Sequence, residues 1–257
     1  MTARHADAVH VVATVSDDDG TTRFVDEAVP YAGNAGPLRL TPARPATSLS
    51  FRWTPAGFDF DFHPAPRRRL VLLLEGALEI SLRSGEARVF RPGDILEIRD
   101  THGEGHRSRA LDGRPFRSAF IALDDDVFLD RRAPMATTDD GVDYVHNQET
   151  ANGVSFFERR RLPYVHGGPE GMVTAELPLT GFQFVSAAGD LDYDWHPAPQ
   201  RQAVLVLTGG LAMAYGDGTS SEVAAGGFLI GEDTRGRGHI TRAIDGRPRF
   251  SVFAHLA

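Results

Sequence analysis

Several stretches of the chain alternate between apolar and polar residues with period two. Phe58–His63 shows this alternation, and Leu191–His196 repeats it, which is typical of strands with one buried face. The runs Leu70–Leu74 and Ala203–Leu207 are apolar throughout and suit strands buried on both faces. Turn signals containing glycine recur at intervals of about 8 to 12 residues, a spacing typical of antiparallel barrels and sandwiches. The pattern therefore predicts an all-β protein.

The chain contains an internal duplication. His63-Pro64-Ala65-Pro66 recurs as His196-Pro197-Ala198-Pro199, and 196 minus 63 is 133. The same offset relates Gly76 to Gly209 and His106 to His239. A register held over this distance indicates two copies of one domain rather than a short solenoid repeat. We expect an N-terminal barrel over residues 1–123, an acidic, turn-rich linker over 124–141 and a C-terminal barrel over 142–257.

Composition narrows the available chemistry. The 257 residues include no cysteine and no lysine, so all 27 basic residues are arginine. Disulfides, thiolate nucleophiles, cysteine-ligated zinc and lysine Schiff bases are therefore excluded. The net charge of -8 argues against a nucleic-acid partner, which usually requires a basic surface. No stretch reads as a signal peptide or a membrane span, so we expect a cytoplasmic protein with no membrane partner.

The motifs around the histidines that recur 133 residues apart resemble those of a known superfamily, the cupins. The stretch His63–His106 is similar to small bacterial cupins whose motifs read His-x-Ala-Pro-Arg-Arg-Gln and Asp-Thr-x-Gly-x-Gly-His. Because the resemblance covers both halves, the chain resembles a tandem bicupin with two jelly-roll barrels. The superfamily includes oxygenases, isomerases, decarboxylases, epimerases and non-catalytic binding proteins, so the resemblance alone does not choose a function.

The resemblance also implies a pattern of metal ligands. A metal-binding cupin supplies two histidines, a glutamate and a later histidine. In both halves of this chain alanine replaces the second histidine, and Arg69 and Gln202 occupy the glutamate position. His196, Gln202 and His239 could still hold a divalent Zn, Ni, Fe or Mn ion in the C-terminal barrel. The two histidines could equally act without metal as acid and base. No organic cofactor is expected.

The N-terminal pocket is expected to favour anions. Period-two geometry places Arg69 on the same strand face as His63, with His106 joining them from the second motif. The electrostatic repulsion between a guanidinium and a divalent cation about 4 Å away is about 8 kcal/mol at an effective dielectric constant near 20. Arginine binds carboxylates bidentately, so His63, Arg69 and His106 are predicted to bind an anionic ligand. Alternatively, Arg69 pairs with Glu75 or Glu79.

The C-terminal pocket is expected to be neutral and more open. His196, His239, Gln200 and Gln202 are its candidate ligand-binding residues. Asp194 lies two positions before His196 on the same strand face, where its carboxylate could orient the imidazole. Alternatively, this carboxylate lies only at the wet mouth of the barrel.

These observations predict a bicupin that acts on a small anionic metabolite, with His196 and His239 as metal ligands or as acid and base. The alternative is a non-catalytic bicupin that binds a small-molecule ligand, and the sequence does not decide whether the protein is an enzyme. The two halves are expected to pack as an internal pseudo-dimer, and the fused pair could form a homodimer. The other histidines show no grouping and are expected at the surface: His5, His10, His146, His166 and His255.

Overall fold

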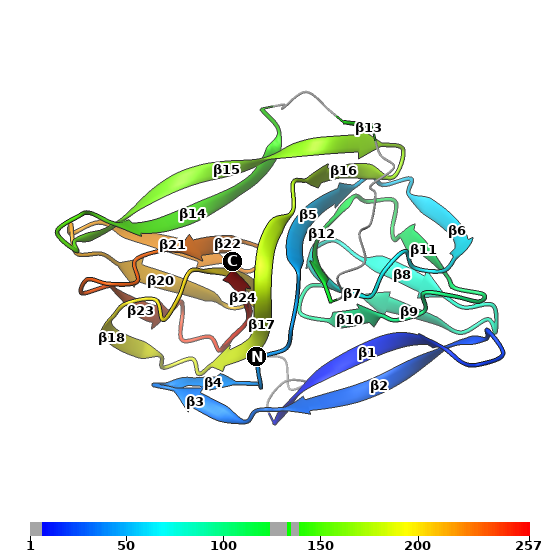
Figure 1. Cartoon of the computed structure of the whole chain (residues 1–257), viewed down its shortest axis with the longest axis horizontal. Coiled ribbons are helices and arrows are strands. Elements are labelled where there is room, and N and C mark those ends of the chain that lie inside the picture. Colours follow the sequence, from blue (N-terminus) through cyan, green and yellow to red (C-terminus); the bar gives the residue numbers. More distant parts are fainter. Residues whose placement is uncertain (1–6, 124–132, 135–138) are drawn as a thin grey trace.

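A computed structural model describes residues 7–123, 133–134 and 139–257 of the chain. Most of the predicted linker, 124–141, lies outside the described residues, so the domain boundaries stay a prediction. The described residues form 24 strands and no helix, and none of them belongs to a helix long and apolar enough to cross a membrane. Two barrels lie side by side, with the N-terminal barrel at the right of Figure 1 and the C-terminal barrel at the left.

The N-terminal barrel is a jelly roll of two four-stranded sheets. One sheet has the strand order β10-β7-β12-β5 and the other has the order β6-β11-β8-β9, which is the double-sheet arrangement of jelly rolls. Its strands are β5 (Ser48–Thr54), β6 (Asp59–His63), β7 (Arg69–Glu75), β8 (Leu78–Ser81), β9 (Ala87–Phe90), β10 (Ile95–Ile98), β11 (His106–Ala110) and β12 (Phe116–Ala122).

The C-terminal barrel repeats this topology strand for strand. Its sheets have the orders β22-β19-β24-β17 and β18-β23-β20-β21. Its strands are β17 (Leu177–Ala187), β18 (Asp192–His196), β19 (Gln202–Thr208), β20 (Gly210–Ala214), β21 (Ser220–Ala224), β22 (Phe228–Gly231), β23 (His239–Ala243) and β24 (Arg249–Leu256). The prediction of an all-β chain with two tandem jelly-roll barrels is confirmed.

The apolar runs form central strands with both faces buried, as predicted. On β7, Leu70, Leu72 and Leu74 join a large core shared by both barrels, whereas Val71 and Leu73 face a smaller core inside the N-terminal barrel. β19 divides in the same way, because Leu205 and its like-facing neighbours join the shared core while Val204 and Val206 point into the C-terminal barrel. Alternation with period two thus assigns each strand one face to a barrel interior and one to the junction.

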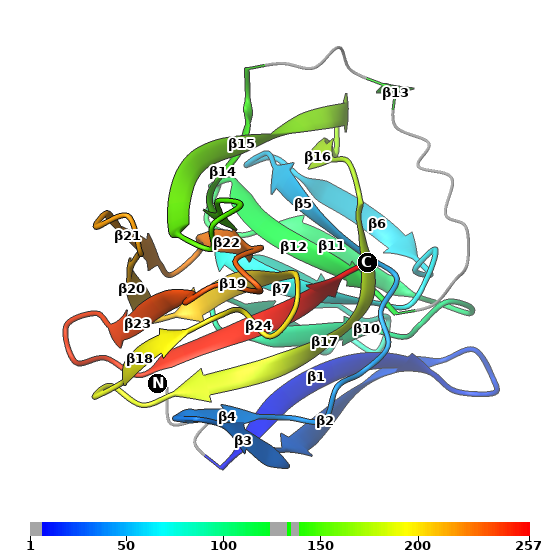
Figure 2. The same ribbon diagram turned by 60° about the vertical axis from the view of Figure 1, so that its left-hand side comes forward.

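The shared core joins residues from the two halves directly. The rings of Phe51 and Phe228 stack with their centroids 4.3 Å apart, and Phe184 and Leu72 are fully buried in the same cluster. Burial of each such side chain contributes about 1.5–3 kcal/mol relative to exposure. β5 and β17 also pair with each other between the barrels, as Figure 2 shows near its centre.

Each half extends an arm of strands that reaches the other barrel. β1 (Ala8–Ser16) and β2 (Thr22–Pro30) form a hairpin on their own barrel, with β1 parallel to β10. β3 (Gly33–Ala35) and β4 (Leu38–Leu40) then cross, and β4 pairs with β17. In the second half, β14 (Gly141–Glu149) pairs with its own β22, while β16 (Gly171–Thr174) crosses to β5. β15 (Ser155–Gly168) connects these two strands, and β13 (Ala133–Pro134) pairs with its end.

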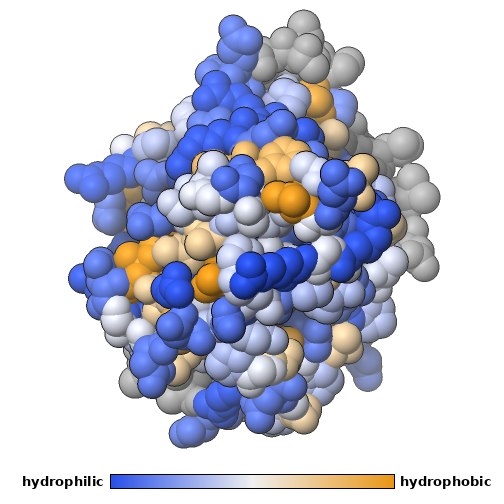
Figure 3. All heavy atoms as spheres, turned by 90° about the vertical axis from the view of Figure 1, so that its left-hand side faces the viewer, coloured by the Kyte–Doolittle hydropathy of each residue, from blue (hydrophilic) through white to orange (hydrophobic). Residues whose placement is uncertain are grey.

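The outer surface of the C-terminal barrel is mainly polar. Figure 3 shows this end of the molecule as largely hydrophilic, with small apolar areas between charged side chains. Among the described residues, the exposed large apolar side chains are Phe60, Val89 and Val154. Such scattered residues are ordinary for a folded protein surface, so the cavities inside the barrels are the better candidates for a functional site.

Candidate functional site

Each barrel brings its two motif histidines close together on neighbouring strands. His63 on β6 pairs in register with His106 on β11, and their ring centroids lie 4.8 Å apart. His196 on β18 pairs in the same way with His239 on β23, with centroids 4.6 Å apart. The structure therefore joins the first and second motif of each half into one histidine pair.

A glycine before each second histidine allows this close approach. Gly238 has a φ of 76°, and a Cβ atom there would lie 1.9 Å from the carbonyl oxygen of His196. Gly105 has a φ of 67°, and a Cβ atom there would lie 2.0 Å from the carbonyl oxygen of His63. Only glycine accommodates both this backbone conformation and this contact, which explains the Gly-His step in both copies of the second motif.

Hydrogen bonds fix the tautomer of both C-terminal histidines. Nδ1 of His196 lies 2.7 Å from the backbone carbonyl oxygen of Asp194, which can only accept a hydrogen bond. Nδ1 of His239 lies 2.6 Å from Oδ2 of Asp233, a carboxylate with no exposed surface. Both neutral rings therefore carry their hydrogen on Nδ1, which leaves the lone pair on Nε2 free for chemistry.

The predicted role of Asp194 needs correction. The backbone of Asp194, and not its carboxylate, orients His196, and the side chain lies on the exposed surface. The carboxylate that orients an imidazole is Asp233, which bonds to the other histidine of the pair. The equivalent Asp100 holds His106 at 2.7 Å in the N-terminal barrel. Both aspartates occupy the first position of the second motif, so the recurrence of Asp100 as Asp233 at the same offset is the sequence signal for this contact.

The two buried aspartates differ in their second oxygen. Thr14 donates a hydrogen bond to Oδ1 of Asp100, whereas Oδ1 of Asp233 is buried without a partner among the described residues. At the position equivalent to Thr14 the second half has Asn147, whose amide bonds instead to Tyr215 and Met213. More of the negative charge of Asp233 is thus left to stabilise a positive charge on His239.

The N-terminal cavity contains the three residues predicted for it. Its volume is about 750 Å³, and His63, Arg69 and His106 line it together with aromatic side chains. The Arg69 guanidinium lies 4.8 Å from the centroid of the Phe120 ring. Glu75 and Glu79, the alternative partners of Arg69, form ion pairs with Arg117 and Arg109.

The C-terminal cavity is smaller and carries a charge. Its volume is about 500 Å³, and all four predicted residues line it: His196, Gln200, Gln202 and His239. Arg249 also lines it, is 2% exposed and has no hydrogen-bond or ion-pair partner at Nε among the described residues. The expectation of a neutral, more open pocket is wrong, because period-two reasoning followed β18 and β19 and did not include β24.

The positive charge of Arg249 contributes to a lowered pKa of His196. Burial lowers the pKa of Arg249 to about 10, so the guanidinium stays cationic at neutral pH. Burial is also the main cause that lowers the pKa of His196; the positive charge of Arg249 lowers it further, while the hydrogen bond to the Asp194 backbone and the charge of Asp233 partly offset this. His196 is therefore neutral at pH 7. An uncompensated buried charge costs about 3–5 kcal/mol, which makes Arg249 an energetically unusual residue.

The C-terminal residues do not fit a divalent metal ion. Two imidazole nitrogens and the Gln202 amide are the candidate donors, and the described residues contain no group of three His, Cys, Asp or Glu side chains placed to share an ion. The guanidinium of Arg249 lines the same cavity and would repel a dication. The Nδ1 bonds of both histidines are typical of metal ligands, but they serve acid–base chemistry equally well.

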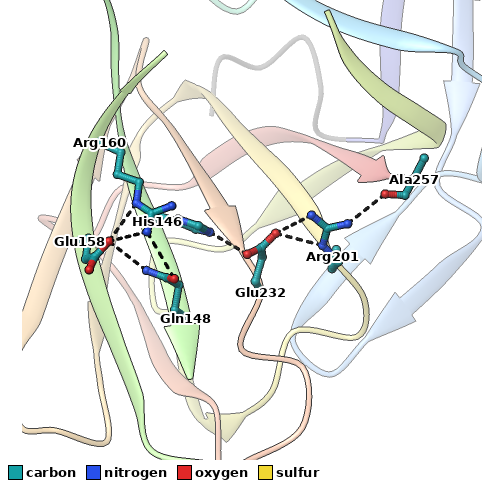
Figure 4. Close-up of polar contacts among 7 residues, drawn as sticks. All are labelled: His146, Gln148, Glu158, Arg160, Arg201, Glu232 and Ala257. Atoms are coloured by element: carbon teal, nitrogen blue, oxygen red, sulfur yellow. Dashed lines mark hydrogen bonds and ion pairs between the residues drawn. The ribbon is translucent and has the colours of Figure 1, made fainter. Parts of the chain in front are cut away.

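Two histidines expected at the surface are not there. His146 is buried, and its Nε2 lies 2.9 Å from Glu232. Glu232 also accepts hydrogen bonds from Arg201, which in turn donates to the carbonyl oxygen of Ala257. Figure 4 shows these contacts, which link Ala257 to His146 on β14 and to Glu232 next to β22. His255 lines the C-terminal cavity, and burial lowers its pKa.

Arg249, Tyr193 and His255 are thus cavity residues that sequence reasoning missed. Arg249 could have been found from the repeat, because the equivalent position in the first half is Phe116. An arginine that replaces a core phenylalanine in one copy is a signal of altered chemistry. Tyr193, whose ring stacks on His196 at 3.8 Å, gave no such signal because the alternation places an aromatic residue there in both halves.

Comparisons with known proteins find similar solved structures at low sequence identity. No family model and no curated protein matches the chain. Among solved structures it is similar to a cupin 2 conserved barrel domain protein from Leptotrichia buccalis, with 15% identity over 88% of this chain and 92% of that one and a TM-score of 0.42. It is also similar to quercetin 2,3-dioxygenase from Acinetobacter baumannii, with 16% identity, coverages of 95% and 77% and a TM-score of 0.36.

A third similar structure is an enzyme from Bacillus subtilis. The oxalate decarboxylase of Bacillus subtilis, described with Mn(II) centres, shares 11% identity over 95% of this chain and 75% of that one, with a TM-score of 0.32. The chemistry of the present chain has to be argued from its own residues.

Proposed function

We propose that the C-terminal barrel binds a small metabolite and transfers a proton to or from it, with His239 as the base and His196 as its partner. The observation that carries the proposal is the pair of free Nε2 atoms on neighbouring rings, each fixed by a bond at Nδ1. Both rings line a cavity of about 500 Å³, a size typical of sites for small ligands.

His239 is the better base of the two because of its buried partner. Asp233 holds the ring at 2.6 Å and stabilises the imidazolium that forms when Nε2 accepts a proton, as the aspartate of a catalytic triad does. The free second oxygen of Asp233 concentrates this effect on His239. His196 has only a carbonyl oxygen behind it, and its lowered pKa keeps it neutral, as a hydrogen-bond acceptor at Nε2.

A second function, binding without catalysis, fits the N-terminal barrel. There both oxygens of the buried aspartate are engaged, by His106 and Thr14, and burial lowers the pKa of His63. The cavity is larger, and most of its exposed wall is apolar. These features favour a ligand-binding pocket, and they keep the non-catalytic alternative for this half of the molecule.

Hydrogen–deuterium exchange tests the proposed proton transfer. A panel of small carbonyl compounds, both charged and neutral, is incubated in D₂O with the protein, and loss of the proton signal next to the carbonyl group is followed by NMR. We expect the wild type to accelerate exchange for at least one compound and His239→Gln to lose about 100-fold or more of that rate. His106→Gln, the matching change in the N-terminal barrel, should retain it. Equal rates for the wild type and His239→Gln across the panel would refute the proposal.

A further inference from the structure

Arg249 is an unpaired cation in the wall of the C-terminal cavity. It is the one arginine among the described residues that line this cavity, and no aspartate or glutamate lines it. The residue is 2% exposed, and its Nε has neither solvent nor a protein acceptor in the described part of the chain. The arginines that form ion pairs elsewhere in the molecule are mostly at the exposed surface, such as Arg242 with Asp192.

We infer that Arg249 binds the carboxylate of a small monoanionic ligand in the C-terminal cavity. The inference deepens the proposed function, on which it rests for the location of the chemistry, by naming the class of the substrate. A buried charge without a partner is stabilised when an anion enters and pairs with it. Guanidinium and carboxylate match in shape and form charge-assisted hydrogen bonds.

The charges around the cavity favour a monoanion over a phosphate dianion. Arg249 supplies one positive charge to the wall, while the pKa of His196 is lowered, so that this ring contributes none at neutral pH. The chain has no lysine that could supply another. Asp233, which is buried behind His239, adds a negative charge that opposes a second charge on the ligand.

The ligand anchor belongs to the C-terminal copy alone. The position equivalent to Arg249 is Phe116, which lines the N-terminal cavity, and the position equivalent to Arg69 is Gln202, which lines the C-terminal cavity. The cavity arginines thus lie on different strands in the two barrels: Arg52 on β5 and Arg69 on β7 in the N-terminal barrel, and Arg249 on β24 in the C-terminal barrel. The repeat supplies one matched exchange, Arg249→Phe, which introduces the residue that the other barrel already accommodates.

Binding of acetate, with acetamide as its neutral isostere, tests the inference. NMR titration of the full-length protein should show saturable binding of acetate that shifts the His196 and His239 signals, and no such binding of acetamide. Arg249→Phe should weaken acetate binding at these signals by about 100-fold, as expected for loss of a charge-assisted pair. Arg242→Gln, a change at an exposed arginine of the same barrel, should leave acetate binding at the His196 and His239 signals unchanged. Arg249→Met is measured beside Arg249→Phe, so that a misfolded variant cannot decide the result.

Three results would overturn the inference: no saturable acetate binding by the wild type, equal binding of acetate and acetamide, or unchanged acetate binding in folded Arg249→Phe and Arg249→Met. These outcomes are separate from failure of the proton-transfer proposal. Acetate binding that depends on Arg249, without any deuterium exchange that depends on His239, would remove the catalytic proposal and leave the anion site. Deuterium exchange that depends on His239 but not on Arg249 would remove the anion site and leave the catalytic proposal.

Discussion

At the scale of single residues, the two C-terminal histidines differ in what stands behind them. His239 has a buried carboxylate and His196 a backbone carbonyl, and a nearby guanidinium acts on His196. A ring backed by a carboxylate gains stability on protonation, whereas a buried ring near a cation loses it. The same residue type is therefore held in two different electrostatic surroundings in one cavity.

The first prediction concerns the titration of His196. Its pKa in the folded protein should lie below the ordinary value of 6.5 and rise in Arg249→Phe, because one positive charge is removed. Its contribution to folding stability is then complete above pH 6.5 and is lost as the pH falls below that value, because the unfolded chain binds the proton first. NMR titration of the imidazole signals, with the urea-unfolded protein as reference, measures both values. A pKa above 6.5 in the folded wild type would contradict the proposed environment.

The second prediction concerns metal affinity. Gln202 is 6% exposed and lines the cavity beside the histidines, so Gln202→Glu should add a carboxylate ligand and raise zinc affinity at least about tenfold. Gln202→Glu combined with Arg249→Phe should raise it further, because the repelling cation is gone. Titration with zinc and a competing chelator measures the affinity, and Gln200→Glu, at an exposed position of the rim, is the control. Stoichiometric zinc binding by the wild type at affinities above that of the variants would contradict the poor fit to a metal.

The site was predictable to the extent that the repeat marked it. The histidine pairs followed from their shared offset, and Gln202 and Arg69 followed from their positions relative to the glycines. Arg249 lies in the final apolar strand, far from either motif, so only its contrast with Phe116 pointed to it. Whether a buried arginine has a partner is a property of side-chain packing, and no spacing rule reports it.

At the scale of elements, the exchanged arms link each cavity to the opposite half. Ala35, Leu38 and Leu40 of the first arm line the C-terminal cavity, and the loop that ends β15 lines the N-terminal one. Gly36, in the turn between β3 and β4, has a φ of 56°, and a Cβ atom there would lie 2.8 Å from the ring of Tyr193. Tyr193 stacks on His196, so the arm positions the histidine through one intervening ring.

The third prediction tests this arm. Gly36→Ala should displace Tyr193 from His196, lower the free energy of unfolding by roughly 1–2 kcal/mol because of the left-handed backbone, and shift the His196 imidazole signal. Gly33→Ala is the matched control in the same arm, because a Cβ atom there meets nothing within 4 Å. Chemical denaturation and the histidine NMR spectrum give the two readouts. An unchanged His196 signal in Gly36→Ala would show that the arm does not position the ring.

The strands of the arms could be expected from the sequence, but their partners could not. Alternation with period two identifies which face of a strand is buried and does not say which barrel buries it. The duplication made each half look self-contained, whereas β4 pairs with β17 and β16 pairs with β5. The exchange follows from the geometry of the junction between the barrels, which no local pattern encodes.

At the scale of the whole molecule, the shared core makes the stability of each barrel depend on the other. Leu72 belongs to the core that both halves build, while its neighbour Leu73 belongs to the interior of the N-terminal barrel, and both are 0% exposed. The chain also has two tryptophans, Trp53 in the first half and Trp195 in the second. Each tryptophan can therefore report on the unfolding of its own barrel.

The fourth prediction is that the two barrels unfold in one transition. Single-tryptophan variants, Trp53→Phe and Trp195→Phe, should give the same denaturant midpoint by fluorescence, since separating the barrels would expose the shared core. Leu72→Ala should lower both midpoints together and reduce the free energy of unfolding by about 2–5 kcal/mol. Leu73→Ala removes the same number of atoms from the interior of the N-terminal barrel alone. It should also lower both midpoints if the barrels unfold together. If Leu73→Ala lowers only the Trp195→Phe midpoint, which reports through Trp53, the barrels are independent units, and the shared core is an interface between domains that fold alone.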